Sequence, residues 1–182
     1  MKTLIFNGSP RKNGDTSKLL EKFCASLDGE VRIVRAYDCG IKPCADCRYC
    51  WKHSGCSIKD EMTELYDYIG ECDNIIIASP VYFSTLTGPL LSVLSRVQTL
   101  FCSRFFRGEP RMGGERGAVI VVGGGDGSPD GAVKTARMLL RQMGVDEILS
   151  VISFHDTNHR PAAEDEGTCL QIEKLAADLS GR

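Results

Sequence analysis

The 182-residue chain lacks any apolar run able to cross a bilayer, since no hydrophobic stretch approaches the roughly 20 residues that a membrane helix needs. It also lacks an excess of charge, because 22 lysines and arginines stand against 24 aspartates and glutamates. That balance gives no electrostatic reason to expect a nucleic acid or a membrane as partner. The apolar run after Lys2 is too short for a secretory signal, so we expect a cytoplasmic protein.

Several motifs of nucleotide and phosphate chemistry are missing as well. The chain has no G-x4-G-K-[ST], no G-x-G-x-x-G, and no cysteine followed six residues later by arginine. These absences exclude a Walker loop and a cysteine-phosphatase loop, and they leave a Rossmann-type dinucleotide site unsupported. Internal repeats and low-complexity linkers are also absent, so we expect residues 1–182 to form a single domain that is large enough to bury one core.

The chain does contain a regular alternation of short apolar runs and longer amphipathic segments. We expect strands at residues 3–6, 31–34, 74–79, 117–122 and 148–154, and helices at about 16–27, 60–69, 90–101, 132–143 and 172–179. Repeated strand–helix units imply right-handed crossovers and a parallel sheet. We therefore predict an α/β, flavodoxin-like three-layer sandwich, with a five-stranded parallel sheet of order 2-1-3-4-5 and helices on both faces.

The densest feature is a cysteine-rich loop at residues 39–59. Four of the nine cysteines follow a C-x2-C-x2-C-x5-C pattern, at Cys44, Cys47, Cys50 and Cys56. One continuous run of this kind can wrap a [4Fe–4S] cluster, with one thiolate for each iron. Structural zinc more often uses two knuckles separated by a longer stretch, and disulfides need an oxidising compartment. The spacing favours the iron–sulfur cluster, with zinc and redox-active or inert thiols as alternatives.

Ligands of an open parallel sheet bind beyond the carboxyl ends of its strands. The first such loop, residues 8–17, combines glycines and hydroxyl groups with one arginine and the free N–H groups of a helix start, which predicts a phosphate site. Asp15 would repel a phosphate, so we expect it to point away or to cap the helix.

Two further loops belong to the same edge of the predicted sheet. Residues 79–88 carry Tyr82 and Phe83, which offer flat surfaces to a planar ring. Residues 122–131 contain five glycines, which let the main chain lie against a ligand or remain mobile. A phosphate loop, an aromatic loop and a glycine loop together predict a flavin mononucleotide (FMN) site, which His155 and His159 after the last strand would border.

Four segments resemble a known family. GSPRKNGDTSKLL, CADCRYCWKHSGCSIKDEM, ASPVYFSTLTGPL and FFRGEPRMGGERGAVIVVGGGDG are similar, in this order, to the NADPH-dependent FMN reductase superfamily, and most of all to its iron–sulfur flavoproteins. The resemblance implies that the FMN phosphate is held by Ser9, Arg11, Asp15, Thr16 and Ser17. It implies that the isoalloxazine lies between Pro80, Val81, Tyr82 and Phe83 on one flank and Gly123, Gly124 and Gly125 on the other. It implies that the cluster ligands are Cys44, Cys47, Cys50 and Cys56.

The resemblance also implies an activity. We expect an oxidoreductase that passes electrons from a reduced donor, such as NAD(P)H or a redox protein, to an acceptor through FMN and a [4Fe–4S] cluster. The flavin carries the hard chemistry, so no catalytic acid or base is named. The family implies a homodimer or homotetramer.

Two alternatives stay open at this point. One is an NAD(P)H-dependent FMN or quinone reductase without a cluster, and the other is a non-catalytic electron carrier or zinc-stabilised interaction module. The arginine-rich residues 103–116, expected on a long connection, are candidates to cover the flavin and to bind a nicotinamide phosphate or an acidic redox protein.

Overall fold

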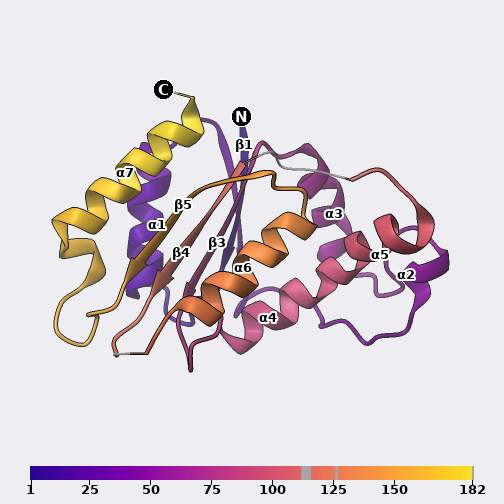
Figure 1. Cartoon of the computed structure of the whole chain (residues 1–182), viewed down its shortest axis with the longest axis horizontal. Helices are drawn as coiled ribbons and strands as arrows, with labels where there is room; N and C mark the ends of the chain where they lie inside the picture. Colours follow the sequence, from indigo (N-terminus) through magenta and orange to yellow (C-terminus); the bar gives the residue numbers. More distant parts are fainter. Residues whose placement is uncertain (112–115, 126, 182) are drawn as a thin grey trace.

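The computed structural model describes residues 1–111, 116–125 and 127–181 (Figure 1). Its strands are β1 (Lys2–Asn7), β2 (Glu30–Arg35), β3 (Asn74–Pro80), β4 (Arg116–Val122) and β5 (Glu147–Phe154). They form one sheet in the order β2-β1-β3-β4-β5, and every neighbouring pair is parallel. This arrangement confirms the predicted flavodoxin-like fold.

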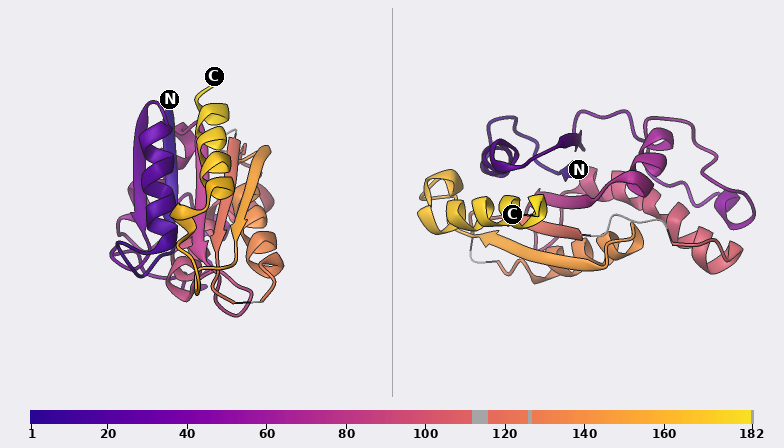
Figure 2. Two further views of the ribbon diagram at one scale, coloured as in Figure 1. Left: turned by 90° about the vertical axis from the view of Figure 1, so that its left-hand side faces the viewer. Right: turned by 90° about the horizontal axis from the view of Figure 1, so that it is seen from above.

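Helices cover both faces of the sheet. The longer ones are α1 (Asp15–Ser26), α3 (Met62–Glu71), α4 (Gly88–Leu94), α5 (Gln98–Arg107), α6 (Asp130–Gln142) and α7 (Glu166–Ser180). Shorter turns are α2 (Tyr49–Lys52) and the 3₁₀ helices η1 (Ser95–Val97) and η2 (Ala162–Glu164). Helices α1 and α7 lie on one face, and α3, α4, α5 and α6 lie on the other (Figures 1 and 2).

The core consists of two apolar layers, one on each face of the sheet. Neighbouring residues of β3 alternate between them, since Ile76 packs against α1 and α7 while Ile75 and Ile77 pack against the other helices. All three isoleucines are completely buried, as expected of a central parallel strand covered on both faces. The sheet therefore gives the loops at its carboxyl edge a rigid base.

The predicted helix at 90–101 is in fact three segments. Helices α4 and α5 are separated by the 3₁₀ turn η1, and α5 continues to Arg107 before Gly108 ends it with a left-handed φ of 64°. The first part of the arginine-rich segment is thus helical and is not a long connection. Residues 112–115 of that segment lie outside the described residues.

The cysteine loop lies at one end of the long axis of the molecule. It connects β2 to α3, carries α2, and projects together with α5 on the side opposite α7 (Figure 1). Helix α2 packs on α5, where the Trp51 ring stacks on Phe106 at 4.4 Å between centroids. Across the described ranges, no helix has the length and hydrophobicity that a bilayer crossing requires.

Candidate functional site

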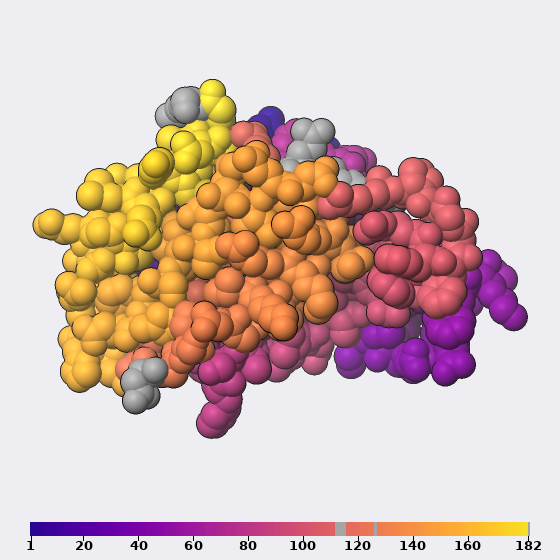
Figure 3. All heavy atoms as spheres, in the orientation of Figure 1, coloured from indigo at the N-terminus to yellow at the C-terminus, as the bar shows by residue number. Residues whose placement is uncertain are grey.

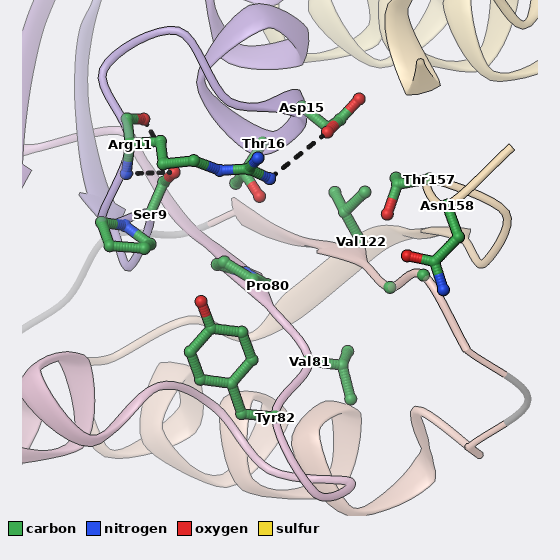
Figure 4. Close-up of a pocket in the computed structure, with 13 residues that line it drawn as sticks. Ser9, Arg11, Asp15, Thr16, Pro80, Val81, Tyr82, Val122, Thr157 and Asn158 are labelled. Carbon is green, nitrogen blue, oxygen red and sulfur yellow. Dashed lines mark hydrogen bonds and ion pairs between the residues drawn. The ribbon is translucent and has the colours of Figure 1, made fainter. Parts of the chain in front are cut away.

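A cavity of about 200 Å³ opens at the carboxyl edge of the sheet (Figure 4). Four loops line it, those after β1, β3, β4 and β5. Nine of the residues expected at a flavin site line this cavity, namely Ser9, Arg11, Asp15, Thr16, Pro80, Val81, Tyr82, Gly123 and Gly124. The structure does not place Ser17, Phe83 or Gly125 in its wall. Segments far apart in the sequence therefore meet at one site.

The loop after β1 is folded by its own hydroxyl groups. Asn7 Oδ1 accepts a hydrogen bond from the Ser9 amide at 2.8 Å. The hydroxyl groups of Ser9 and Ser17 both donate to the carbonyl of Arg11 at 2.9 Å. Ser17 thus shapes the loop from beneath the cavity, whereas Thr16 is one of the lining residues. The hydrogen bonds explain why serines stand at both positions.

The N-terminus of α1 leaves donors available to a ligand. No side chain caps this helix, and the first described helical hydrogen bond runs from the Lys18 amide to the Gly14 carbonyl at 2.9 Å. In the described part of the chain, the amides of residues 15–17 have no acceptor. Free amides at a helix start and the positive end of the helix dipole suit an anion such as a phosphate group.

Asp15 lies in the wall of the cavity with its carboxylate already engaged. Its Oδ1 accepts a hydrogen bond from the Ala162 amide at 2.9 Å, and its Oδ2 lies 3.7 Å from Arg11 Nη2 (Figure 4). Arg11 partly offsets the negative charge that would otherwise face a phosphate. Since the Arg11 side chain is 75% exposed, this ion pair adds little stability by itself.

The loop after β3 presents one aromatic residue to the cavity and turns the other away. Tyr82 and Thr85 exchange backbone hydrogen bonds of 3.0 and 2.9 Å around a tight turn. Phe83 and Ser84 at its tip have left-handed φ values of 50° and 60°, a conformation that non-glycine residues seldom adopt. Phe83 is fully exposed, and the segment after β3 projects from the lower edge of the molecule (Figure 3).

The glycine loop after β4 packs closely against the loop after β5. A Cβ atom on Gly123 would lie 2.7 Å from His155 Nδ1, and one on Gly124 would overlap Asn158 Oδ1. A Cβ on Gly125 would meet nothing within 4 Å. A side chain at either of these two positions would therefore force His155 or Asn158 to move.

The loop after β5 supplies site residues that the sequence did not single out. Thr157 and Asn158 line the cavity, as do Pro10 and Val122. His155, which was expected at the border, packs against Gly123 of the cavity wall and bonds to Ser153 Oγ at 2.6 Å. His159, which was expected there as well, bonds to Asp156 Oδ1 at 2.7 Å. The sequence offered one signal for Thr157 and Asn158. Their loop follows a predicted parallel strand, and the carboxyl ends of parallel strands share one edge of the sheet.

The lining residues fit FMN by their chemistry. Free amides, the Thr16 hydroxyl and the Arg11 guanidinium lie where the first loop meets the cavity, and they suit a phosphate group. Val81 and Tyr82 lie across the cavity from them and suit a flat ring (Figure 4). Gly124 also lines the cavity, with bare backbone. A Cβ at Gly124 would push against Asn158, so the shape of this wall depends on the glycine at that position.

A second, much smaller cavity lies inside the cysteine loop. All four cysteines of the run line it, together with Arg96. Its volume of about 20 Å³ has room for roughly one water molecule. The donor set fits a four-thiolate centre, yet within the described ranges no three Cys, His, Asp or Glu side chains stand in positions that would hold a metal ion.

The thiols of the run have different environments. Cys47 is exposed, and a 3.1 Å hydrogen bond with Ser57 Oγ lowers the pKa of its thiol. Burial raises the pKa of Cys50 to about 11, and the neighbouring thiol of Cys102 adds to the effect. A metal would have to displace the proton of Cys50 from a site that favours the neutral thiol.

The arginines of residues 103–116, which were candidates to cover a flavin, make contacts within the chain. Arg107 pairs with Glu109 at 2.7 Å and also donates to the Cys50 carbonyl. Arg111 pairs with Asp146. Arg104 and Arg116 are likewise held, over the Phe105 ring at 5.5 Å and by the carbonyls of Asp178 and Leu179. None of the four lines the cavity at the sheet edge.

Comparison with known proteins agrees with this geometry. An iron–sulfur flavoprotein of Archaeoglobus fulgidus is 29% identical over 157 residues, which cover 85% of this chain and 69% of the relative. Matches to three further iron–sulfur flavoproteins span 60%, 53% and 48% of their lengths. A putative NAD(P)H-dependent FMN-containing oxidoreductase of Bacillus subtilis, YwqN, is 30% identical over 125 residues, covering 68% of this chain and 67% of YwqN.

A likeness in structure supports the same fold. The NAD(P)H:quinone oxidoreductase of Methanothermobacter marburgensis superposes with a TM-score of 0.71 at 18% identity, covering 99% of this chain and 95% of the other. The profile of the NADPH-dependent FMN reductase family matches residues 1–159. The chain therefore belongs to the NADPH-dependent FMN reductase family.

Proposed function

We propose that this protein is an FMN-binding oxidoreductase that passes electrons from a reduced donor to an acceptor through FMN and a [4Fe–4S] cluster. One observation carries the flavin part of the proposal: four strand-end loops meet around a cavity that has free amides on one side and a glycine wall on another. NAD(P)H, another small molecule or a redox protein would act as donor or acceptor.

The residues that line the cavity at the carboxyl edge of the sheet would bind different parts of FMN. Arg11, Thr16 and the amides at the start of α1 would hold the phosphate. Val81, Tyr82 and Gly124 would flank the ring and keep water from it. When bound, FMN supplies the exchange of a hydride or of single electrons. The chain itself binds and orients, and no described side chain is needed as an acid or base.

The four cysteines would hold the cluster. Two facts support this assignment: all four thiols line one cavity, and several relatives carry the name iron–sulfur flavoprotein. A cluster of this type supplies one-electron exchange when bound. The thiolates would then carry its charge inside the loop.

A reductase without a cluster is the second candidate. It is favoured by the absence, within the described ranges, of any three side chains placed to hold a metal ion. In that case the protein would be an NAD(P)H-dependent FMN or quinone reductase in which the cysteines remain thiols. The iron content of the protein separates the two candidates.

We also propose a homodimer or homotetramer. Large apolar side chains are exposed together at the end of the molecule that carries the cysteine loop, where Tyr49 is 40%, Phe105 62% and Phe106 50% exposed. Clustered exposed aromatic residues are typical of contact surfaces. Light scattering coupled to size-exclusion chromatography will give the mass, and a monomer at all concentrations would contradict this part.

The flavin site is tested by titration of the apoprotein with FMN and with riboflavin, followed by flavin fluorescence. Hydrogen bonds to a charged group are worth about 1.5–3 kcal/mol each, so we expect riboflavin to bind at least about tenfold more weakly. Equal affinities would show that the amides of α1 do not hold a phosphate. Failure to bind either ligand would refute the flavin site altogether.

The cluster is tested by iron and sulfide analysis of protein purified without oxygen. We expect about four iron ions per chain, as a cubane requires, and a marked loss of iron in Cys47→Ser. The control is Cys24→Ser, because Cys24 lies on α1 outside the loop. If the unaltered protein contains no iron but oxidises NAD(P)H with a quinone, the second candidate is correct.

A further inference from the structure

Arg96 is buried beneath the cysteine loop, with 1% of its surface exposed. Its Nη1 donates to the Lys42 carbonyl at 2.9 Å, and its Nη2 donates to the Ile58 carbonyl at 3.1 Å. Lys42 lies two residues before Cys44, and Ile58 lies two residues after Cys56. One guanidinium group therefore holds both stems of the loop.

Asp60 and Ser95 complete this anchor. The Asp60 carboxylate accepts hydrogen bonds from Arg96 Nη1 at 2.8 Å and from the Lys42 amide at 3.0 Å. The Ser95 hydroxyl accepts a hydrogen bond from the Cys44 amide at 2.9 Å. Ser95 and Arg96 both belong to η1, so the 3₁₀ turn between α4 and α5 presents two adjacent side chains to the loop. A 3₁₀ turn within a helix often marks a functional position.

The loop between the stems has a conformation that needs such support. Asp46 and Arg48, on either side of Cys47, have left-handed φ values of 47° and 60°. Residues other than glycine adopt this backbone conformation at a cost, and it persists only where surrounding contacts determine it. The hydrogen bonds of η1 to both stems are contacts of that kind.

One nitrogen of Arg96 makes no hydrogen bond. Its Nε–H is buried and has no acceptor among the residues that the structure describes. Arg96 also lines the small cavity that all four cysteines line. A buried donor without an acceptor is costly, and an anionic sulfur in that cavity would satisfy it.

Building on the iron–sulfur centre proposed above, we propose that Arg96 is the positioning residue of the cysteine site: it fixes both stems of the loop and donates its Nε–H to a sulfur of the centre that the thiolates hold. Hydrogen bonds and positive charge near a cluster stabilise the reduced form more than the oxidised form. Arg96 thus raises the reduction potential of that centre.

The first test compares Arg96→Lys with the unaltered protein after anaerobic loading with ferrous iron and sulfide. The potential of the centre is measured by a redox titration followed by electron paramagnetic resonance. We expect a lower potential with unchanged FMN affinity. The matched control is Arg111→Lys, since Arg111 also pairs with an aspartate and donates to two carbonyls, but away from the cysteine cavity. An unchanged potential in Arg96→Lys would overturn the proposal.

A second test needs no iron and therefore stands apart from the cluster. The double variant Arg96→Met, Asp60→Asn removes the ion pair without leaving a buried charge. In iron-free protein, iodoacetamide should label Cys44 and Cys56 roughly tenfold faster in this variant, because the loop opens more often. Labelling at the unaltered rate would refute the anchoring role. An unaltered protein that binds FMN but takes up no iron refutes the cluster instead, and the labelling result then decides the role of Arg96.

Discussion

The largely buried carboxylate of Asp60 shows how one charged side chain can stabilise the folded state. Its side chain is 8% exposed and accepts hydrogen bonds from Arg96, from the Lys42 amide and from the Met62 amide. Burial alone would raise the pKa of Asp60, but these donors and the positive charge of Arg96 outweigh it and lower the pKa below its ordinary 3.8. The carboxylate therefore stabilises the folded state whenever it is ionised.

Asp60→Asn should reduce the free energy of unfolding by about 3–5 kcal/mol at pH 7, since it leaves Arg96 buried and unpaired. The contribution of a carboxylate with a lowered folded-state pKa is complete above the unfolded pKa and disappears as pH falls through the folded pKa. The difference in unfolding free energy between the two proteins should therefore begin to shrink below about pH 3.8 and should vanish only once the pH falls below the lower folded-state pKa. Urea unfolding at pH 7 and pH 3 measures the difference in free energy of unfolding between the two proteins at each pH. A difference that does not become smaller in acid would contradict this account.

Gly124 offers a test of the flavin wall at the level of one methyl group. In Gly124→Ala the new Cβ would displace Asn158 or the loop, so we expect FMN binding to weaken by about 1–3 kcal/mol, roughly one to two orders of magnitude in dissociation constant. Gly125→Ala is the control, because its Cβ would meet nothing within 4 Å. Fluorescence titration of both variants decides, and equal affinities would remove Asn158 and Gly124 from the site.

Among the elements, the cysteine loop and the end of α3 carry thiols in opposite environments. Cys47 is exposed with a lowered thiol pKa, whereas burial raises the pKa of Cys72, at the end of α3, to about 12. Thiolates are the reactive species, so iron-free protein should be alkylated first at Cys47 and last at Cys72. The exposed tip of the cysteine loop is thus reactive, whereas the buried thiol after α3 is inert.

The hydrogen bond between Ser57 and Cys47 can be tested through the same reaction. Ser57→Ala should raise the pKa of Cys47, and the midpoint of its labelling rate against pH should move upward. Ser54→Ala is the control, since Ser54 lies in the same loop and has no hydrogen bond to Cys47. Peptide mass spectrometry after timed iodoacetamide pulses gives the rates. Identical midpoints in the three proteins would show that Ser57 does not tune Cys47.

The elements also show where sequence patterns suffice and where they stop. The strands and their order follow from apolar runs and crossover rules, so the fold was predictable. The η1 turn was not, because the apolar spacing of Leu90, Leu94, Val97 and Phe101 continues across it. Its importance depends on contacts of Arg96 with Lys42 and Ile58, more than 35 residues away along the chain.

The candidate site shows the same division. The phosphate loop, Tyr82 and Gly124 were predictable, since composition and the edge rule both point to them. Asn158 was not, because the sequence drew attention to the neighbouring His155 and His159 and gave no signal for the residues between them. The outward direction of Phe83 depends on left-handed backbone at two non-glycine residues, a conformation that local sequence rarely indicates.

For the molecule as a whole, the cavity joins segments from residue 9 to residue 158, so a bound ligand should stabilise the entire fold. At an FMN concentration 100 times the dissociation constant, the gain is about 2.7 kcal/mol, or about 5–10 °C in melting temperature for a domain of this size. Circular dichroism melts with and without FMN measure the shift. No shift at saturating FMN would mean that the ligand binds elsewhere or not at all.

The anchor on η1 has a consequence for the architecture of the chain. Because Lys42 and Ile58 bond to the same guanidinium group, the chain enters and leaves the cysteine segment at neighbouring points. Changes in loop length cost little free energy when the ends stay fixed. We therefore expect that the intervening residues can be lengthened or trimmed while β2 and α3 keep their places.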